Sequence, residues 1–399
     1  MKEPIVCDYL IIGAGIVGLS LAYELTNRFP KKHIVLIEKE DRVACHASGR
    51  NSGVLHAGFY YSSDSLKARL CVEGNRLMKE FCREHEIAVK LCGKVVVVAN
   101  EAELEGLREL ERRGKRNGVE VSLIGTDELA RIEPNAKTHK QALYSPSTAS
   151  VDPALVCEKL SEVLQKKGVR IHFAVRYLRR KGDLILTNRS AYQAKRLINA
   201  AGLYADKIAR DFGFSKHRVI IPFKGIYLQY NGNDLPCQTH IYPVPNLLNP
   251  FLGVHYTLSV HNRVNLGPTS IPAFWRENYS GFEGFKWGEF LQILYYEAKL
   301  FLFNSFNFRK LAIHEIRKYN RKHFVGLAKD LTHNCKANAF NEWLAPGIRA
   351  QLLNTETLKL EMDFLLEGDE HSLHILNAVS PAFTCSFAFA RYIISEKLA

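Results

Sequence analysis

The first forty residues alternate between apolar runs and a segment whose apolar positions have helical spacing. Residues 9–12 form a β-rich apolar run that ends in glycines, and residues 16–29 follow with a helical pattern. Residues 33–37 form a second apolar run, which closes on Glu38. This order predicts a strand–helix–strand unit at the very start of the chain.

The later segments continue this alternation and then change in character. The predicted helices span 66–85, 101–118 and 153–167, and the predicted strands span 94–99, 169–174 and 196–201. The stretches 218–230 and 254–266 are strand-like and dominated by Tyr, Ile and Val. They predict an antiparallel sheet that is inserted between returns of the chain to its first domain.

Composition narrows the class of protein. With 399 residues, 47% of them hydrophobic, the chain can bury a large core as one domain or two joined domains. A formal charge of +13 permits acidic metabolites, anionic lipid or nucleic acid as partners, but no localised basic patch or aromatic signature indicates nucleic acid. Nine cysteines without CxxC spacing, no apolar leader and no long apolar stretch predict a cytoplasmic protein with reduced thiols that does not span a membrane.

The strand–helix turn carries a nucleotide-binding motif. Gly13, Gly15 and Gly18 satisfy G-x-G-x-x-G directly after the strand, and Glu38 follows Gly18 by twenty residues. Gly13 permits the tight turn, Gly15 lets the backbone approach a pyrophosphate, and Gly18 lets the helix pack on the strand. Glu38 would accept hydrogen bonds from an adenosine ribose, and its charge disfavours NADP. The same loop serves NAD and FAD.

A second loop bears on the choice between NAD and FAD. Residues 47–53 hold no apolar side chain larger than alanine, so the segment exposes backbone donors instead of packing a core. Its polar and glycine positions are Ser48, Gly49, Arg50, Asn51, Ser52 and Gly53.

With the run 48–61, Ser-Gly-Arg-Asn-Ser-Gly-Val-Leu-His-Ala-Gly-Phe-Tyr-Tyr, the chain resembles the flavin-binding D-amino-acid-oxidase superfamily, and within it the L-2-hydroxyglutarate oxidase/dehydrogenase branch. Further matches occur in family order from about Cys7 to Tyr392. They include residues 65–69, 199–203, 222–225, 241–245, 251–255, 266–268, 346–351 and 374–382.

This resemblance implies an α/β fold: a Rossmann-like FAD-binding domain interleaved with an antiparallel-sheet substrate domain of α+β type. The expected FAD-binding segments are 1–85, 151–217 and 341–399, and the expected substrate-domain segments are 86–150 and 218–340. Additional flavin contacts are implied at Ala200, Gly202, Asn377, Ser380 and Ala382. The last three precede a predicted helix, 384–395, whose dipole would stabilise the reduced flavin.

The implied reaction is FAD-dependent oxidation of L-2-hydroxyglutarate to 2-oxoglutarate, with a hydride passing from C2 to flavin N5 and electrons then passing to a quinone or to oxygen. Related flavoproteins that oxidise glycerol 3-phosphate, malate or an amino acid are the alternative. A second alternative is a protein that keeps the flavin fold but serves only as an interaction scaffold.

Three kinds of residue are needed for that chemistry. Arg349 is favoured as the carboxylate anchor because Gly-Ile-Arg resembles the substrate-binding Gly-Leu-Arg of the superfamily and a guanidinium suits a bidentate contact. His56 and His255 are the candidates for the base, with a slight preference for His255. A second substrate carboxylate also needs a donor. The available matched residues are Tyr60, Lys67, Arg69 and Lys224.

Two further expectations concern partners. The segment 282–322 mixes aromatic, aliphatic and basic residues in a way typical of an interfacial helix, which would attach the protein peripherally to the inner face of the cytoplasmic membrane. The alternative is that these helices pack on the substrate domain or form a dimer contact. No His, Cys or acidic group has ligand spacing, so no metal site is expected.

Overall fold

The computed structural model describes residues 3–245 and 251–398. The chain divides into two compact units, each built from separated segments. Unit 1 comprises Met1–Arg50, Pro153–Pro222 and Arg349–Ala399, and unit 2 comprises Asn51–Asp152 and Phe223–Ile348. Strands β12 (Arg218–Gly225) and β19 (Gly347–Asn354) each begin in one unit and end in the other.

Unit 1 is built on a mixed sheet in the order β20-β21-β11-β1-β2-β8. Its strands are β1 (Ile5–Ile12), β2 (Ile34–Ile37), β8 (Arg170–His172), β11 (Ala191–Asn199), β20 (Leu365–Gly368) and β21 (Ser372–Asn377). The pairs from β21 to β8 are parallel, and β20 is an antiparallel edge. A hairpin of β9 (Tyr177–Lys181) and β10 (Leu184–Thr187) extends β11.

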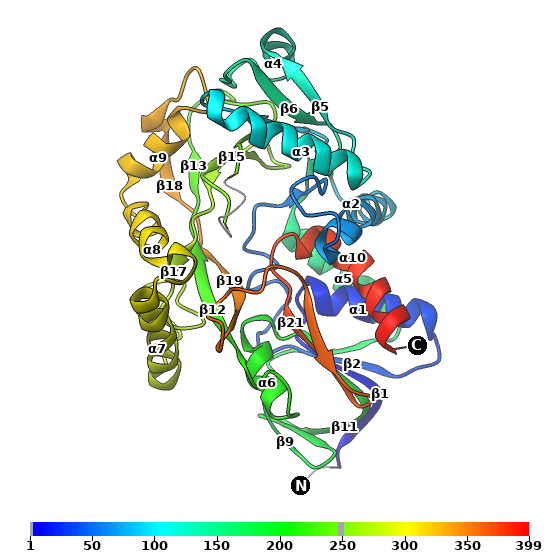
Figure 1. The fold of residues 1–399 in the computed structure, drawn as a ribbon. Coiled ribbons are helices and arrows are strands. Elements are labelled where there is room, and N and C mark those ends of the chain that lie inside the picture. Colours follow the sequence, from blue (N-terminus) through cyan, green and yellow to red (C-terminus); the bar gives the residue numbers. More distant parts are fainter. Residues whose placement is uncertain (1–2, 246–250, 399) are drawn as a thin grey trace. The chain divides into compact units, whose positions relative to one another are not determined.

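Helices cover this sheet because its strands are apolar on both faces. Helix α1 (Ile16–Arg28) packs against α5 (Pro153–Lys166) and α10 (Ala382–Ile393), as Figure 1 shows. Leu10 and Ile12 of β1 point to the opposite face and join a cluster with Val35, Ile37 and Ile208 of α6 (Ala205–Arg210). The predicted strand–helix–strand unit is confirmed.

Unit 2 is built on an eight-stranded sheet in the order β18-β13-β16-β15-β14-β4-β6-β5. Its strands are β4 (Lys94–Val97), β5 (Ser122–Gly125), β6 (Gln141–Ser145), β13 (Leu228–Tyr230), β14 (His240–Pro243), β15 (His255–Leu258), β16 (Val264–Gly267) and β18 (Phe340–Trp343). The predicted antiparallel pairing holds for every neighbouring pair except β14 and β4, which run parallel. Short pairs complete the unit: β3 (Val54–Leu55) with β7 (Ala149–Ser150), and β17 (Ile271–Pro272) with β12.

The sheet of unit 2 separates two apolar clusters. Val95 and Val97 of β4 face one cluster and Val96 faces the other, as expected from the alternation of side chains along a strand. The helices of the unit are α2 (Leu66–Glu84), α3 (Leu104–Arg116), α4 (Thr126–Ile132), α7 (Trp287–Phe303), α8 (Phe308–Arg317) and α9 (Arg321–Lys329). None of the described helices is long and apolar enough to cross a membrane.

The first unit boundary differs from the predicted domain boundary. The predicted FAD-binding segment extends to residue 85, whereas unit 1 leaves its first segment at Arg50. Helix α2 lies in unit 2, where Asn75 donates hydrogen bonds to the carbonyls of Leu55, His56 and Ser147. Helical periodicity identifies α2 but does not indicate which sheet it packs on.

Candidate functional site

The turn between β1 and α1 in unit 1 has room only for glycine. Gly13 has φ +104°, and a Cβ there would lie 2.6 Å from the carbonyl oxygen of Ala200. A Cβ on Gly18 would lie 2.0 Å from the carbonyl oxygen of Gly13. Gly15, in extended conformation, caps the N-terminus of α1. This close backbone at a helix N-terminus fits a pyrophosphate.

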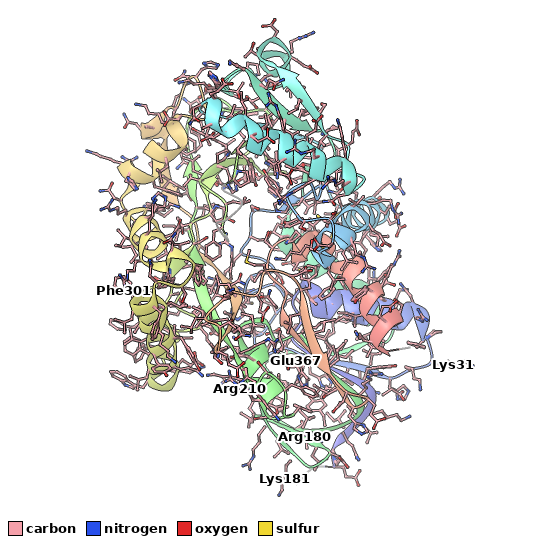
Figure 2. All side chains as sticks on the ribbon, in the orientation of Figure 1. Lys31, Arg180, Lys181, Arg210, Phe301 and Glu367 are labelled. Atoms are coloured by element: carbon pink, nitrogen blue, oxygen red, sulfur yellow. The ribbon has the colours of Figure 1, made fainter. Side chains whose placement is uncertain are left out.

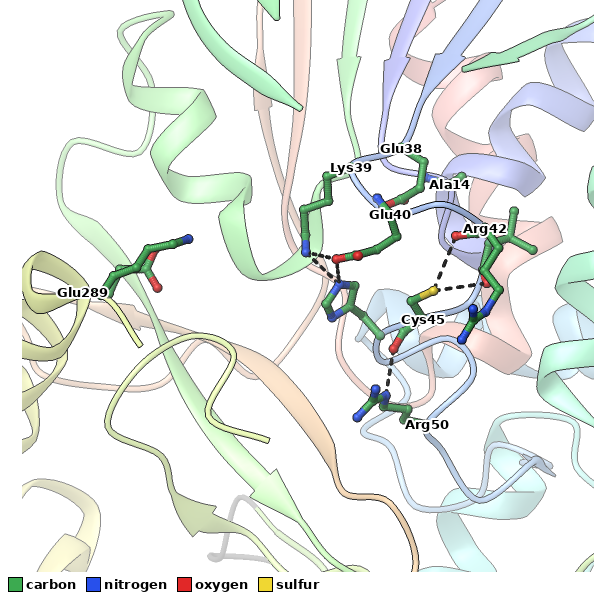
Figure 3. Close-up of polar contacts among 11 residues, drawn as sticks. Ala14, Glu38, Lys39, Glu40, Arg42, Cys45, Arg50 and Glu289 are labelled. Carbon is green, nitrogen blue, oxygen red and sulfur yellow. Dashed lines mark hydrogen bonds and ion pairs between the residues drawn. The ribbon is translucent and has the colours of Figure 1, made fainter. Parts of the chain in front are cut away.

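Glu38 lies directly after β2 and is buried. Its two carboxylate oxygens accept hydrogen bonds from the backbone amides of Ala14 at 2.8 Å and Glu40 at 3.0 Å (Figure 3). The carboxylate is thereby fixed beside the glycine turn. An acid held at this point fits a ribose hydroxyl of an adenine dinucleotide.

The polar loop that follows is ordered by its own backbone. The amides of Gly49 and Arg50 donate to the carbonyl of His46, and the Arg50 side chain donates to the carbonyl of Cys45 at 2.7 Å (Figure 3). Ser48 Oγ accepts a hydrogen bond from the amide of Ile16 at 2.9 Å, which brings the loop to the start of α1. The remaining predicted loop residues, Asn51, Ser52 and Gly53, open unit 2, where Asn51 Oδ1 accepts from the amide of Gly53.

The other predicted flavin residues lie at strand ends of unit 1. Ala200 follows β11, its amide donates to the carbonyl of Ile12, and Gly202 begins a 3₁₀ turn at φ +52°. Asn377 ends β21, and its amide group bonds three backbone groups of unit 1. Ser380 and Ala382 lie at the N-terminus of α10, which begins two residues earlier than predicted.

In unit 2 the structure brings both predicted base candidates into one buried cluster. His56, His240 and His255 interact electrostatically with one another, and Lys94 acts on His56 and His240. Burial and the charge of Lys94 hold the pKa values of His56 and His240 well below the ordinary range for histidine. These imidazoles are therefore neutral near pH 7.

Hydrogen bonds fix the ring protons of two of these histidines. His255 Nδ1 lies 2.7 Å from the carbonyl oxygen of Gly253, which can only accept, so Nδ1 carries a proton, and in the neutral form of the ring Nε2 carries the lone pair. In His240 the amide of Leu258 donates to Nδ1 at 3.1 Å, so the proton is on Nε2 and points to Ser150 Oγ at 3.3 Å. Of these two neutral rings, that of His255 presents Nε2 as an acceptor and that of His240 does not.

Lys94 and Tyr242 are members of this cluster that the sequence did not indicate. Lys94 is fully buried, and its Nζ lies 4.0 Å from the ring centre of Tyr242, 5.2 Å from that of Tyr60 and 5.7 Å from that of Phe59. The ring of Tyr242 also stacks on His255, with 3.7 Å between centroids. In the sequence Lys94 is the first residue of an apolar run, a position typical of an exposed residue at the end of a strand. Its burial among aromatic rings is apparent only in the folded sheet.

The predicted substrate residues occupy different environments. Tyr60 is buried, and its hydroxyl has no hydrogen-bond partner among the described residues, while burial raises its pKa and keeps it a donor. Lys67 lies on the buried face of α2 and Arg69 on its exposed face. Lys224 is buried in β12, which lowers its pKa. Arg349 is half-buried in β19, where unit 1 resumes.

Comparison with known proteins places these features in a family. A family model described as FAD dependent oxidoreductase matches residues 8–395. The L-2-hydroxyglutarate dehydrogenase of Escherichia coli (strain K12) is 33% identical and aligns with 98% of this chain and 92% of that protein. The protein of the same name from Indibacter alkaliphilus is 35% identical, with 95% and 96% covered. The mitochondrial one of Caenorhabditis briggsae is 34% identical, with 98% and 93% covered.

Solved structures share the fold at lower identity. The FAD-bound L-alpha-glycerophosphate oxidase of Mycoplasma pneumoniae is 20% identical and superimposes with a TM-score of 0.77 over 98% of this chain and 94% of that chain. L-proline dehydrogenase from P.horikoshii is 15% identical, with a TM-score of 0.71 over 99% and 94%. The chain therefore belongs to the family of FAD-dependent oxidoreductases, and FAD is its cofactor.

Proposed function

We propose that this chain oxidises L-2-hydroxyglutarate to 2-oxoglutarate. Relatives named L-2-hydroxyglutarate dehydrogenase align with nearly the whole length of this chain. The observation that carries the proposal is the bond from His255 Nδ1 to the carbonyl of Gly253, because it leaves Nε2 as a proton acceptor in a buried cluster. Bound FAD supplies the acceptor for the hydrogen on C2, and the glycine turn, Glu38 and Ser48 would hold it.

In this proposal the residues of the chain bind, orient and deprotonate the substrate. Nε2 of His255 takes the proton of the C2 hydroxyl as the C2 hydrogen leaves with its electron pair, so the oxygen becomes a carbonyl. Arg349 grips one carboxylate through two parallel N–H donors. The O–H of Tyr60 donates a hydrogen bond to the substrate, and Lys67, Arg69 and Lys224 are the cationic candidates for the second carboxylate.

Anaerobic titration of the purified protein tests this function. L-2-hydroxyglutarate should bleach the flavin absorbance band, and D-2-hydroxyglutarate should not. Glycerol 3-phosphate, malate and amino acids test the alternative substrates in the same assay. Bleaching by one of them but not by L-2-hydroxyglutarate would reassign the reaction, and bleaching by none would favour a scaffold. Stopped-flow reoxidation of the reduced protein by oxygen or a soluble quinone then identifies the acceptor.

The role of Arg349 has its own prediction. Arg349→Lys should raise KM for the 2-hydroxy diacid and lower kcat, because a lysine cannot reproduce the planar two-donor grip. The loss in kcat/KM should be about tenfold or more, since a hydrogen bond to a charged group contributes roughly 1.5–3 kcal/mol. The exposed Arg189→Lys is the matched control. Unchanged kinetics would remove Arg349 from the substrate site.

We also propose that α7 and α8 attach the protein to the inner face of the cytoplasmic membrane. Helix α7 buries two glutamates on its inner face and exposes large apolar side chains on its outer face, whereas a water-facing helix exposes polar side chains. Glu289, Ile293, Glu297 and Leu300 are buried. The outward residues recur at helical spacing and include Trp287 at 70% exposure, Leu291 at 59%, Tyr295 at 55%, Phe301 at 44% and Leu302 at 70%.

Cations border this apolar face. Arg309 donates to the last carbonyls of α7, those of Phe301 and Leu302, both at 2.6 Å, and its charge lies over the ring of Phe301, which Figure 2 labels on α7. Lys286, Lys310 and Arg317 are also exposed. Exposed apolar residues beside cations are complementary to anionic lipid, with rings in the headgroup boundary and charges at the phosphates.

Vesicle flotation tests the attachment. The protein should float with vesicles that contain phosphatidylglycerol, and the double variant Leu291→Glu, Leu302→Glu should stay at the bottom. Leu178→Glu places the same charge on an exposed leucine of β9 and is the control. If the wild-type protein does not float, and the double variant turns a dimer into a monomer in sedimentation, the face is a contact between copies of the chain.

A further inference from the structure

Side chains of helix α3 hold the segment of unit 2 that carries Tyr60. Asn117, at the C-terminal end of α3, donates hydrogen bonds to the carbonyls of Gly58 and Tyr61, both at 3.0 Å. Arg113 of the same helix donates to the carbonyl of Tyr60 at 3.2 Å. The backbone on both sides of Tyr60 is therefore fixed by the protein itself, and with it the position from which the side chain of Tyr60 extends.

Two polar side chains at this segment are buried and lack a hydrogen-bond partner among the described residues. They are the hydroxyl of Tyr60 and the Nζ of Lys94, whose side chains are 9% and 0% exposed. Lys94 Nζ lies 5.2 Å from the ring centre of Tyr60, so the two groups belong to one site. A buried hydroxyl or ammonium without a partner costs free energy, which a ligand that accepts hydrogen bonds would offset.

The charge of this site favours an anionic ligand. The titratable groups that raise the pKa of Lys94 are the thiols of Cys71 and Cys92, and no carboxylate of the described residues is among them. Burial raises the pKa of Tyr60, so its hydroxyl stays protonated and acts as a donor. A carboxylate would accept from the hydroxyl and supply the negative charge that the buried ammonium lacks.

We infer that Tyr60 and Lys94 form the subsite for the second carboxylate of the substrate, where Tyr60 donates a hydrogen bond and Lys94 supplies the positive charge. This inference rests on the proposed function. The ring of Tyr242 lies between the subsite and the proposed base: its centroid is 6.4 Å from that of Tyr60 and 3.7 Å from that of His255. The second carboxylate of L-2-hydroxyglutarate is three bonds from C2, so a subsite one ring away from the base suits a short diacid.

The experiment compares L-2-hydroxyglutarate with L-2-hydroxypentanoate, which has the same chain length and a methyl group in place of the second carboxylate. The ratio of kcat/KM for the diacid to that for the monoacid should fall about tenfold or more in Tyr60→Phe and in Lys94→Met, the loss expected for a hydrogen bond to a charged group. Tyr319→Phe, an exposed tyrosine after α8, is the control. Tyr60→Phe should keep the wild-type melting temperature, because the hydroxyl it removes has no partner among the described residues. An unchanged ratio in both variants would overturn the inference.

Binding of glutarate gives a readout that is independent of turnover. Glutarate has both carboxylates and no hydroxyl, so calorimetric titration of the FAD-loaded protein measures the subsite without reducing the flavin. Tyr60→Phe and Lys94→Met should each bind glutarate about tenfold more weakly than the wild-type protein. If Lys67→Met or Lys224→Met weakens glutarate binding and these two variants do not, the inference is overturned. Failure of L-2-hydroxyglutarate to bleach the flavin, with glutarate binding as expected, would count against the proposed function and not against the subsite.

Discussion

Two histidines of unit 2 carry their ring protons on opposite nitrogens, and this difference separates a base from a structural residue. His255 donates through Nδ1 to a backbone carbonyl, whereas His240 accepts a backbone amide at the same atom. A general base needs a lone pair that is directed away from the groups that hold the ring. The backbone of the β14–β15 pair thus assigns the roles that the residue type leaves open.

His255→Asn should slow anaerobic flavin reduction by about a hundredfold or more, which is the usual loss when a general base is removed. Asparagine can still donate to the carbonyl of Gly253 but offers no basic nitrogen. His261→Asn, on the same hairpin and 63% exposed, is the control. An unchanged rate in His255→Asn, with a slow rate in His56→Asn, would transfer the role of base to His56.

The candidate residues of the site could be predicted from the sequence, but not their partners. The resemblance indicates His56 and His255 as base candidates, and the motif spacing indicates Glu38 as a nucleotide ligand. Lys94 could not be predicted, because Phe59, Tyr60 and Tyr242 reach it from segments far apart in the chain. A buried lysine and a strand-end lysine have the same local sequence pattern.

At the scale of elements, the turn from β1 to α1 shows how a motif becomes a steric requirement. Gly18→Ala should lower both the melting temperature and the FAD content, because its Cβ would overlap the carbonyl oxygen of Gly13 at 2.0 Å. Overpacking of this kind costs about 1–3 kcal/mol or more. Gly288→Ala meets nothing within 4 Å and is the control. Full FAD content and an unchanged melting temperature in Gly18→Ala would contradict this view of the turn.

Helices and strands could be predicted from the sequence where a buried face gives the apolar residues a regular spacing, and could not be predicted where no such face exists. The apolar strands β1 and β2 and the amphipathic helices α1, α2 and α5 were predictable for this reason. The strand β9 was missed because four of its five residues are exposed, so its sequence, Tyr-Leu-Arg-Arg-Lys, shows no alternation.

Helix α7 places a carboxyl group where water does not reach it. Burial raises the pKa of Glu297 from its ordinary value of 4.5 to about 8. Because the folded state binds this proton more tightly than the unfolded state, the group stabilises the fold fully below pH 4.5, and that contribution is lost as the pH rises through about 8.

Glu297→Gln should therefore unfold with less dependence on pH between 5 and 9 than the wild-type protein. At pH 9 the variant should be more stable by at least about 1.4 kcal/mol, the equivalent of one pKa unit. Thermal and urea unfolding at several pH values measure this difference. Glu283→Gln, an exposed glutamate before α7, is the control. Parallel pH profiles for Glu297→Gln and the wild-type protein would show that Glu297 is ionised in the folded state.

At the scale of the whole molecule, the chain crosses repeatedly between its two units, so neither unit corresponds to a continuous stretch of sequence. The order of elements predicts part of this interleaving, because elements of the nucleotide-binding type resume at residues 153–201, and the resemblance implies the last return at 341–399. The assignment of residues 51–85 to a unit could not be predicted, since it depends on contacts such as those of Asn75 with Leu55 and Ser147, near the two ends of unit 2's first segment.

The net charge of +13 leads to the last prediction, which concerns the proposed membrane attachment. Each cation near an anionic surface contributes about 1 kcal/mol, and salt screens this attraction within about 10 Å at 0.1 M. Partition onto vesicles containing phosphatidylglycerol should therefore weaken steeply as NaCl rises from 0.05 to 0.5 M. Some binding should persist, because the insertion of the exposed aromatic and leucine side chains of α7 does not depend on charge.

Lys310→Gln and Lys322→Gln, at exposed positions on α8 and α9 respectively, should each weaken binding about fivefold at low salt. Lys31→Gln and Lys181→Gln remove the same charge from unit 1, at positions labelled in Figure 2, and should weaken it less. Equal losses in all four variants would mean that the whole positive surface adheres without orientation, and that α7 to α9 have no particular role in attachment.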